Sequence, residues 1–222
     1  MRKSFRIRTR SFLRIFFFAV IVFLLSFPIY ADGGRIALSF DDGPHPVYTP
    51  RLLDLLSSYG IKATFFTVGE NVVQYPEIVC RELREGHEVG NHTFSHPCLK
   101  KLSAEKLIFE IDRCEETLYE TADYRPYLFR PPEGFCSDAI RKEAEELGYR
   151  IVLWDVDTLD WSSKTSQKHV VDTILSEVSD GDIILCHDYV ARDKSVTVDA
   201  LSEVIPALIG RGFEFVRVSE LE

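Results

Sequence analysis

The chain has 222 residues, of which 45% are hydrophobic and 12% aromatic, which suffices for one domain with a sizeable core or for two small ones. It carries 26 basic and 35 acidic residues, and six of the basic ones fall within the first fourteen positions, which leaves 20 basic against 35 acidic residues, a net charge of −15, in the remainder. So acidic a remainder argues against binding of nucleic acid or anionic polymers and favours a neutral or cationic substrate.

The first thirty-one residues form a separate segment, which begins with six basic side chains and no acidic one. An apolar run from Ile15 to Leu25 follows, and then the sequence SFPIYADGG. This order is typical of a secretory signal peptide, with cleavage expected after Ala31. An uncleaved membrane anchor stays open as an alternative, because the apolar stretch continues weakly to Ala31. In either case the basic end stays inside, so residues 32–222 are expected outside the cytoplasm.

Strand-like and helix-like segments alternate from Arg35 to the C-terminus. The predicted strands cover residues 35–40, 62–69, 87–92, 127–134 (leading into a proline-rich loop), 149–157, 182–188 and 213–218. The predicted helices cover residues 49–60, 75–86, 103–120, 137–148, 168–181 and 198–212. Thr49 is expected to cap the first helix and Gly60 to end it. About seven such units predict an α/β domain with a mostly parallel sheet covered by helices. Alternation alone fits an open doubly wound sheet and a closed barrel about equally well.

Unusual polar residues follow the predicted strands, each at the point where its strand ends. They are Asp41 and Asp42, His92 and His96, Arg130, Asp157 and Asp160, and His187. The carboxyl ends of parallel strands meet at one edge, where α/β folds build their active sites. The sequence therefore predicts a single site assembled from these clusters.

The stretch NHTFSH, residues 91–96, contains two histidines four positions apart, which would lie on one face of a helical turn and grip one metal ion. An isolated pair of this kind is more often structural, but Asp42 at a neighbouring strand end would complete a set of three ligands. Three protein ligands with open positions are typical of a catalytic metal. A metalloprotease of the HExxH type is excluded, because Thr93 stands where its glutamate would be.

The remaining clusters supply acid–base groups. Asp41, next to the ligand Asp42, would act as base, and a buried Arg130 would orient it. His187 would serve as general acid, with Asp160 as the partner that raises its pKa and Trp161 as the wall of a pocket for a methyl group. Asp157 is expected to be a turn or capping residue.

Five ordered motifs, SFDDGP, HTFSH, RPPEG, DTLDW and LCH, resemble those of the polysaccharide deacetylase family (carbohydrate esterase family four), over a stretch from about Arg35 to the C-terminus. The resemblance implies an α/β fold, a distorted (β/α) barrel of about seven strands. It also implies a divalent metal, typically zinc with cobalt or nickel able to serve, and removal of acetyl groups from N-acetylglucosamine-type sugars.

The resemblance assigns a role to each matching position. The metal ligands would be Asp42, His92 and His96; the catalytic residues Asp41, His187, Arg130 and Asp160; and the substrate-binding residues Glu133, Trp161 and Leu185. The family often has an aromatic residue at the position of Glu133, where the backbone N–H makes the oxyanion contact, so this departure affects the neighbouring sugar contact. Cys186 is expected to point away from the His187 side of its strand and to pack in the core.

The substrate is expected to be an N-acetylated glycan of the cell envelope, with peptidoglycan first and chitin-type oligomers next. Two alternatives are an O-acetyl esterase acting on acetylxylan-like glycans and a catalytically silent glycan-binding domain, which would have lost some of the site residues. We expect a monomer that binds no nucleic acid and meets a membrane only through an uncleaved N-terminal segment.

Overall fold

The computed structural model describes residues 33–189 and 196–221. The predicted signal peptide or anchor, residues 1–31, lies outside the described residues, so both interpretations stay predictions. No helix within the two described ranges is long and apolar enough to cross a membrane.

The described residues form one parallel sheet. Seven strands follow the order β5–β4–β3–β2–β1–β7–β6, and β8 pairs with β1. The strands are β1 (Arg35–Asp41), β2 (Thr64–Thr67), β3 (Glu88–Asn91), β4 (Leu128–Phe129), β5 (Arg150–Ile151), β6 (Val156–Asp157), β7 (Ile183–His187) and β8 (Glu214–Phe215).

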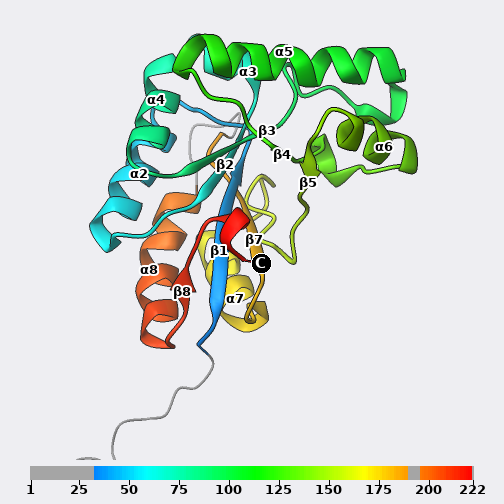
Figure 1. The fold of residues 1–222 in the computed structure, drawn as a ribbon. Helices are drawn as coiled ribbons and strands as arrows, with labels where there is room; N and C mark the ends of the chain where they lie inside the picture. Colours follow the sequence, from blue (N-terminus) through cyan, green and yellow to red (C-terminus); the bar gives the residue numbers. More distant parts are fainter. Residues whose placement is uncertain (1–32, 190–195, 222) are drawn as a thin grey trace, which may run out of the picture. The chain divides into compact units, whose positions relative to one another are not determined.

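Helices connect the strands and lie around the outside of the sheet (Figure 1). They are α2 (Tyr48–Tyr59), α3 (Gly69–Gln74), α4 (Pro76–Arg84), α5 (Ala104–Ala122), α6 (Asp138–Glu146), α7 (Gln167–Glu177) and α8 (Thr197–Gly210), with short 3₁₀ turns at Leu99–Lys101, Pro132–Gly134 and Val218–Glu220. The alternation read from the sequence is therefore confirmed, except that α4 follows α3 with no strand between them and β6 follows β5 with no helix between them.

The prediction of a single strand over residues 149–157 is wrong. This stretch contains two short strands, β5 and β6, which stand at opposite ends of the seven-strand path. Only residues 152–155 separate them, and five residue steps span at most about 18 Å. A flat sheet of seven strands would hold its two edges about 29 Å apart, so the sheet must curl. The curled sheet is the distorted barrel that the family resemblance implied, not the open doubly wound sheet.

Alternate residues of β1 face opposite sides of the curled sheet. Ile36, Leu38 and Phe40 belong to the core shared with the surrounding helices, whereas Ala37 packs on the inner side with Phe66. By the same period of two, the inner side also receives Ser39 and Asp41.

Strand β7 alternates in the same way. Ile184 and Cys186 belong to the outer core, which confirms the packing role predicted for Cys186. Leu185 and His187 therefore face the interior, next to β1, where the register pairs Asp41 with His187. The strand period thus brings Asp41 and His187 to the inner side at the carboxyl ends of β1 and β7.

Helix α2 begins two residues earlier than a cap at Thr49 predicts, at Tyr48, and Val47 is its N-cap. Thr49 is not the cap: its hydroxyl accepts a hydrogen bond from the His45 N–H at 2.8 Å and donates to Asp188 at 2.5 Å. Gly60 ends the helix in a left-handed conformation, as predicted. The Thr49 hydroxyl therefore joins the start of α2 to the end of β7.

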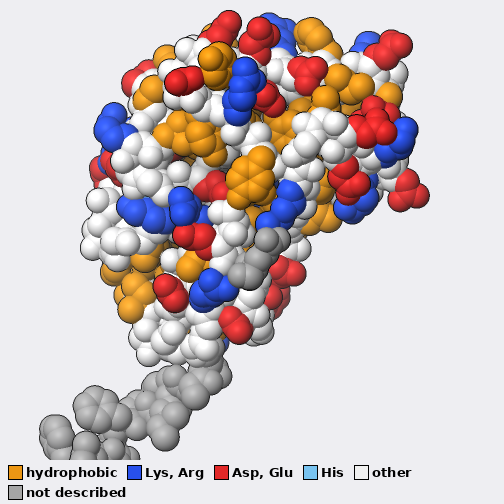
Figure 2. Space-filling model, in the orientation of Figure 1, with side chains coloured by type: hydrophobic (Ala, Val, Ile, Leu, Met, Phe, Trp, Pro, Cys, Tyr) orange, Lys and Arg blue, Asp and Glu red, His pale blue; other side chains and the backbone are white. Residues whose placement is uncertain are grey.

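The acidic excess is not gathered into one patch on the face shown in Figure 2, where Lys and Arg side chains alternate with Asp and Glu and with apolar groups.

Candidate active site

The paired carboxylates diverge at the end of β1. Asp41 is the last strand residue, and Asp42 adopts a left-handed conformation with φ of 75°. Asn71 fixes this turn by donating to the Asp42 carbonyl at 2.7 Å. The next residue must be glycine, because a Cβ on Gly43 would lie 2.1 Å from the buried carboxylate of Asp188. The turn aims one carboxylate inward and the other toward the histidine loop.

The histidine pair does not lie on a helical turn, as the sequence reading expected. Residues 92–96 form an irregular loop in which Thr93 and His96 have positive φ values of 69° and 50°. The Asn91 side chain accepts from the Thr93 N–H at 2.8 Å, and the Thr93 hydroxyl accepts from the His96 N–H at 3.2 Å. Such side-chain bonds compete with helix formation. The two imidazoles nevertheless meet, with ring centroids 5.0 Å apart.

Asp42, His92 and His96 lie together as a candidate metal site, with one ligand atom of each within 4.8 Å of the others. The Oδ1 atom of Asp42 is 3.5 Å from Nε2 of His92 and 3.3 Å from Nε2 of His96. This Oδ1 atom is buried and has no hydrogen-bond partner among the described residues. Nδ1 of His92 donates to the Arg130 carbonyl at 2.6 Å, which leaves its Nε2 lone pair facing Asp42. The donor set therefore fits a divalent metal.

The electrostatics of these three residues also favour a cation. Burial raises the pKa of Asp42, but the close approach and charge of His92 outweigh it, so the pKa of this carboxyl lies below its usual value. Burial lowers the pKa of His92, whereas the charges of Asp41 and Asp42 raise it by more, and the net direction is upward. Burial and the nearby His92 lower the pKa of His96. A positive charge is thus stabilised beside Asp42, and His96 stays neutral enough to be a ligand.

Arg130 follows β4 and is fully buried inside the curled sheet. Its Nη1 donates to Oδ1 of Asp41 at 2.7 Å and to the Ser39 hydroxyl at 2.9 Å. Its Nη2 donates to the Leu153 carbonyl at 3.0 Å, on the segment that joins β5 to β6. Arg130 therefore ties Asp41 to the segment that closes the curl, and the other oxygen of Asp41 lies 3.7 Å from Nε2 of His92.

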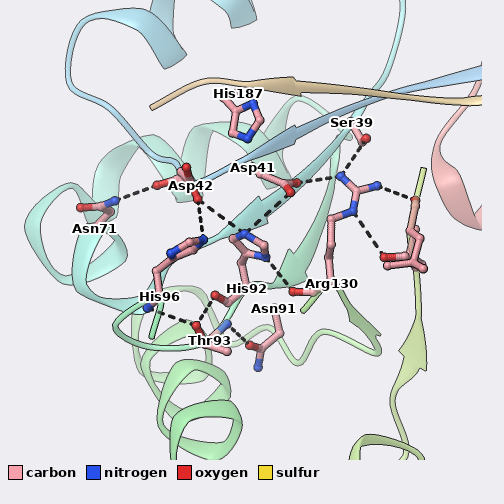
Figure 3. A network of polar contacts seen from close by, with 12 residues as sticks. Ser39, Asp41, Asp42, Asn71, Asn91, His92, Thr93, His96, Arg130 and His187 are labelled. Carbon is pink, nitrogen blue, oxygen red and sulfur yellow. Dashed lines mark hydrogen bonds and ion pairs between the residues drawn. The ribbon is translucent and has the colours of Figure 1, made fainter. Parts of the chain in front are cut away.

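His187 lies on the other side of the aspartates from the histidine pair (Figure 3). Its Nδ1 pairs with Oδ1 of Asp160 at 2.7 Å, and its backbone N–H donates to Oδ2 of the same carboxylate at 2.8 Å. The Thr197 hydroxyl donates to that second oxygen at 2.6 Å. Burial lowers the pKa of His187, but the hydrogen bond and charge of Asp160 outweigh it and raise the pKa to about 9. The imidazole is therefore protonated near neutral pH.

These groups surround a cavity of about 490 Å³, which we call the inner cavity. Its walls are Asp41, Asp42, His92, His96, Glu133, Trp154, Asp157, Trp161, Leu185 and His187. All three predicted substrate-binding residues are among them, and Glu133 has a positive φ of 57°. Arg130 and Asp160 lie behind the walls, in contact with Asp41 and His187.

Trp154 also forms part of the wall, and the sequence did not predict this role because the residue falls inside the predicted strand 149–157. Its ring packs so closely on Gly134 that a Cβ there would lie 2.5 Å from the indole. Asp157 accepts from the Leu159 N–H at 3.0 Å, which fits the predicted turn role, and it also borders the inner cavity.

Comparison with known proteins agrees with this geometry. Residues 30–152 match the polysaccharide deacetylase family model. The chain is 44% identical over 188 residues to a peptidoglycan-N-acetylglucosamine deacetylase of Bacillus cereus, covering 84% of this chain and 87% of the relative.

Two solved structures are also similar. Peptidoglycan deacetylase PdaC from Bacillus subtilis is 39% identical, with a TM-score of 0.78 over 86% of this chain and 90% of that one, although this chain spans only 38% of the full PdaC sequence. A family 4 acetyl xylan esterase from Clostridium thermocellum with a cobalt ion is 34% identical, with a TM-score of 0.79 over 84% and 89%. From the family-model match and these identities, the chain belongs to the polysaccharide deacetylase family.

Proposed function

We propose that this chain is a metal-dependent N-deacetylase that hydrolyses the acetamido group of N-acetylglucosamine-type residues in a cell-envelope glycan, with peptidoglycan as the first substrate. The observation that carries the proposal is the placement of Asp41 and Asp42 between two histidine groups. The Oδ1 atom of Asp42, which has no hydrogen-bond partner among the described residues, faces His92 and His96. His187 borders the same cavity from the opposite side (Figure 3) and is held from behind by Asp160.

Asp42, His92 and His96 would hold the metal, for which we propose zinc, with cobalt or nickel able to serve. Two imidazoles and one carboxylate are ligands that zinc accepts. When bound, such an ion polarises an acyl carbonyl and lowers the pKa of water to about 7. The His92 ring is oriented for this role by its hydrogen bond to the Arg130 carbonyl, because ligating histidines gain basicity and a fixed tautomer from such partners.

The protein's own residues would divide the proton transfers. Asp41, oriented by Arg130, takes a proton from the water that attacks the acetyl carbon. His187, held protonated by Asp160, donates a proton to the nitrogen as the C–N bond breaks, which releases acetate and the free sugar amine. As the family resemblance implies, the backbone N–H of Glu133 would stabilise the oxyanion, and Trp161 and Leu185 would enclose the methyl group.

The choice of substrate is supported by the names of similar proteins, which include peptidoglycan-N-acetylglucosamine and peptidoglycan-N-acetylmuramic acid deacetylases. Chitin-type oligomers are the next candidates, since a chitooligosaccharide deacetylase of Sinorhizobium fredii is 37% identical. We further propose that the domain works outside the cytoplasm as a monomer, either released after cleavage of residues 1–31 or held by them at the membrane.

Acetate release decides between the candidate functions. The full chain is incubated with an N-acetylglucosamine tetramer, purified peptidoglycan and acetylxylan, and the glycan products are read by mass spectrometry. We expect acetate from the first two, with the mass change on N-acetylglucosamine or N-acetylmuramic acid identifying the sugar. Release from acetylxylan alone would establish the O-acetyl esterase instead, and no release from any substrate would leave a glycan-binding domain.

Removal of the metal is expected to reduce acetate release to background, because the attacking water then keeps its ordinary acidity. Dipicolinate treatment and metal analysis give the metal content, and zinc, cobalt and nickel are each added back to identify the ions that restore turnover. His96→Ala should lower the metal content. His169→Ala, which changes an exposed histidine on α7, should not. Full turnover by protein without metal would contradict the proposal.

A further inference from the structure

A second cavity of about 660 Å³ opens beside the inner one, and we call it the outer cavity. Three residues, Asp42, His96 and Trp161, border both cavities. The two cavities are therefore adjacent, and both border the candidate metal site. The volume of the outer cavity is by itself typical of a ligand site. The outer cavity therefore has room for the sugar or substituent next to the one that reacts.

Glu70 places a negative charge at the outer cavity. Glu70 borders it and is exposed, and none of the described residues in its walls is a lysine or arginine. Within residues 33–189 and 196–221 the structure gives the Glu70 carboxylate no hydrogen bond or ion pair. By contrast, the neighbouring amide of Asn71 is occupied by the Asp42 carbonyl. Glu70 thus adds a charge that the catalytic arrangement does not use.

The backbone under Glu70 is well anchored. Its N–H donates to the Phe94 carbonyl at 2.8 Å, and the preceding Gly69 N–H donates to the Thr93 carbonyl at 3.1 Å. Both acceptors belong to the loop that carries His92 and His96. The position of Glu70 relative to the candidate metal site is therefore fixed by main-chain hydrogen bonds.

Trp161 supplies a surface where the two cavities meet. Trp161 is 54% exposed and borders both cavities, so its ring is accessible to a ligand that occupies either of them. Aromatic faces attract both the apolar faces of sugars and cations. A neutral N-acetyl sugar could stack on this ring but could not form an ion pair with the Glu70 carboxylate, whereas a cationic group could do both.

We infer that the outer cavity binds a primary ammonium group carried by the same glycan chain as the reacting N-acetyl sugar, with Glu70 as its counter-ion. The inference rests on the proposed function, because that function places the reacting sugar in the inner cavity. The ammonium has two sources, a glucosamine left by an earlier deacetylation or the amine of a peptide attached to the glycan.

Binding to the full chain tests the inference without relying on turnover. The probes are a glucosamine tetramer and an N-acetylglucosamine tetramer, titrated calorimetrically near neutral pH against the unmodified protein, Glu70→Gln and Glu77→Gln. Glu77 is an exposed glutamate in the first turn of α4 that borders neither cavity, so it controls for the loss of one negative charge.

Glu70→Gln is expected to weaken binding of the glucosamine tetramer by about 2- to 5-fold, the range of partly exposed ion pairs, and to leave the acetylated tetramer unaffected. The difference should vanish near 1 M salt, where the screening length falls to about 3 Å. Equal effects on both tetramers, no effect on either, or the same loss in Glu77→Gln would overturn the inference.

Two further probes identify the source of the ammonium. These are a muropeptide with a free side-chain amine and the same muropeptide with that amine acetylated. Discrimination between them that depends on Glu70 assigns the peptide amine; discrimination confined to the glucosamine tetramer assigns a deacetylated sugar. Acetate release is measured separately. Charge-selective binding without acetate release would contradict the proposed function but would still support the ammonium site.

Discussion

Replacing Asp41 by asparagine is expected to lower acetate release from an N-acetylglucosamine tetramer by about 10²- to 10⁴-fold, the usual contribution of a general base, without lowering the metal content of the protein. The amide keeps an oxygen that can accept the 2.7 Å hydrogen bond of Arg130, so the buried guanidinium is not left without this partner. It cannot, however, take a proton from water near neutral pH. The metal ligands are untouched, and metal analysis of the variant should match the unmodified protein.

A matched control separates the loss of the base from the loss of a charge. Asp54→Asn removes one carboxylate from α2, where Asp54 is exposed and pairs with Arg81 at 2.6 Å. This variant should keep turnover within about 2-fold, since exposed ion pairs contribute little. If Asp41→Asn turned over at the normal rate with an unchanged metal content, Asp41 would not be the base.

Replacing Asp160 by asparagine is expected to move the alkaline limb of the activity profile to lower pH. The hydrogen bond and charge of Asp160 are what raise the pKa of His187 to about 9 against the opposing effect of burial. Without them the pKa should fall toward the ordinary value of about 6.5 or below. At pH 8 the protonated fraction of His187 would then drop by roughly 30-fold, and turnover with it, with partial recovery on lowering the pH.

Stability supplies a second readout for the same pair. Because the folded-state pKa of His187 lies above its unfolded value, the pair stabilises the fold fully below about pH 6.5 and loses this contribution as the pH rises through about 9. The difference in unfolding free energy between the unmodified protein and Asp160→Asn should shrink over that interval. Asp172→Asn, which removes an exposed carboxylate paired with Lys168 on α7, is the control. A parallel loss of activity at every pH would instead indicate a merely structural role.

Several features of the site follow from local sequence alone, and the reason is the geometry of parallel strands. Asp41 and His187 end apolar strands, and parallel pairing brings both to the same edge, where the register places them side by side. The strand period of two also sends Ser39 and Asp41 inward and Cys186 outward. A reader of the sequence can therefore assemble the candidate catalytic residues before knowing whether the sheet is open or curled.

The conformation of the histidine loop could not be read from its own residues. The spacing of His92 and His96 predicted a helical turn, yet the loop is held by Asn91, whose side chain bonds to the Ile111 carbonyl at 2.9 Å and to the Tyr149 hydroxyl at 3.1 Å. These partners lie 20 and 58 positions along the chain. The spacing of the two histidines predicted that they would converge, whereas the long-range hydrogen bonds of Asn91 determine the loop conformation in which they do so.

The sequence by itself determined the order of strands and helices, the family resemblance and the set of candidate site residues, because strand period and chain order are local properties. Only the tertiary structure decided that residues 149–157 divide between the two ends of the sheet. It alone brought Trp154 to the inner cavity and Glu70 to the outer one. Arg130 shows the reason: its bonds to Asp41 and to the Leu153 carbonyl exist only once the sheet has curled and brought its two edges together.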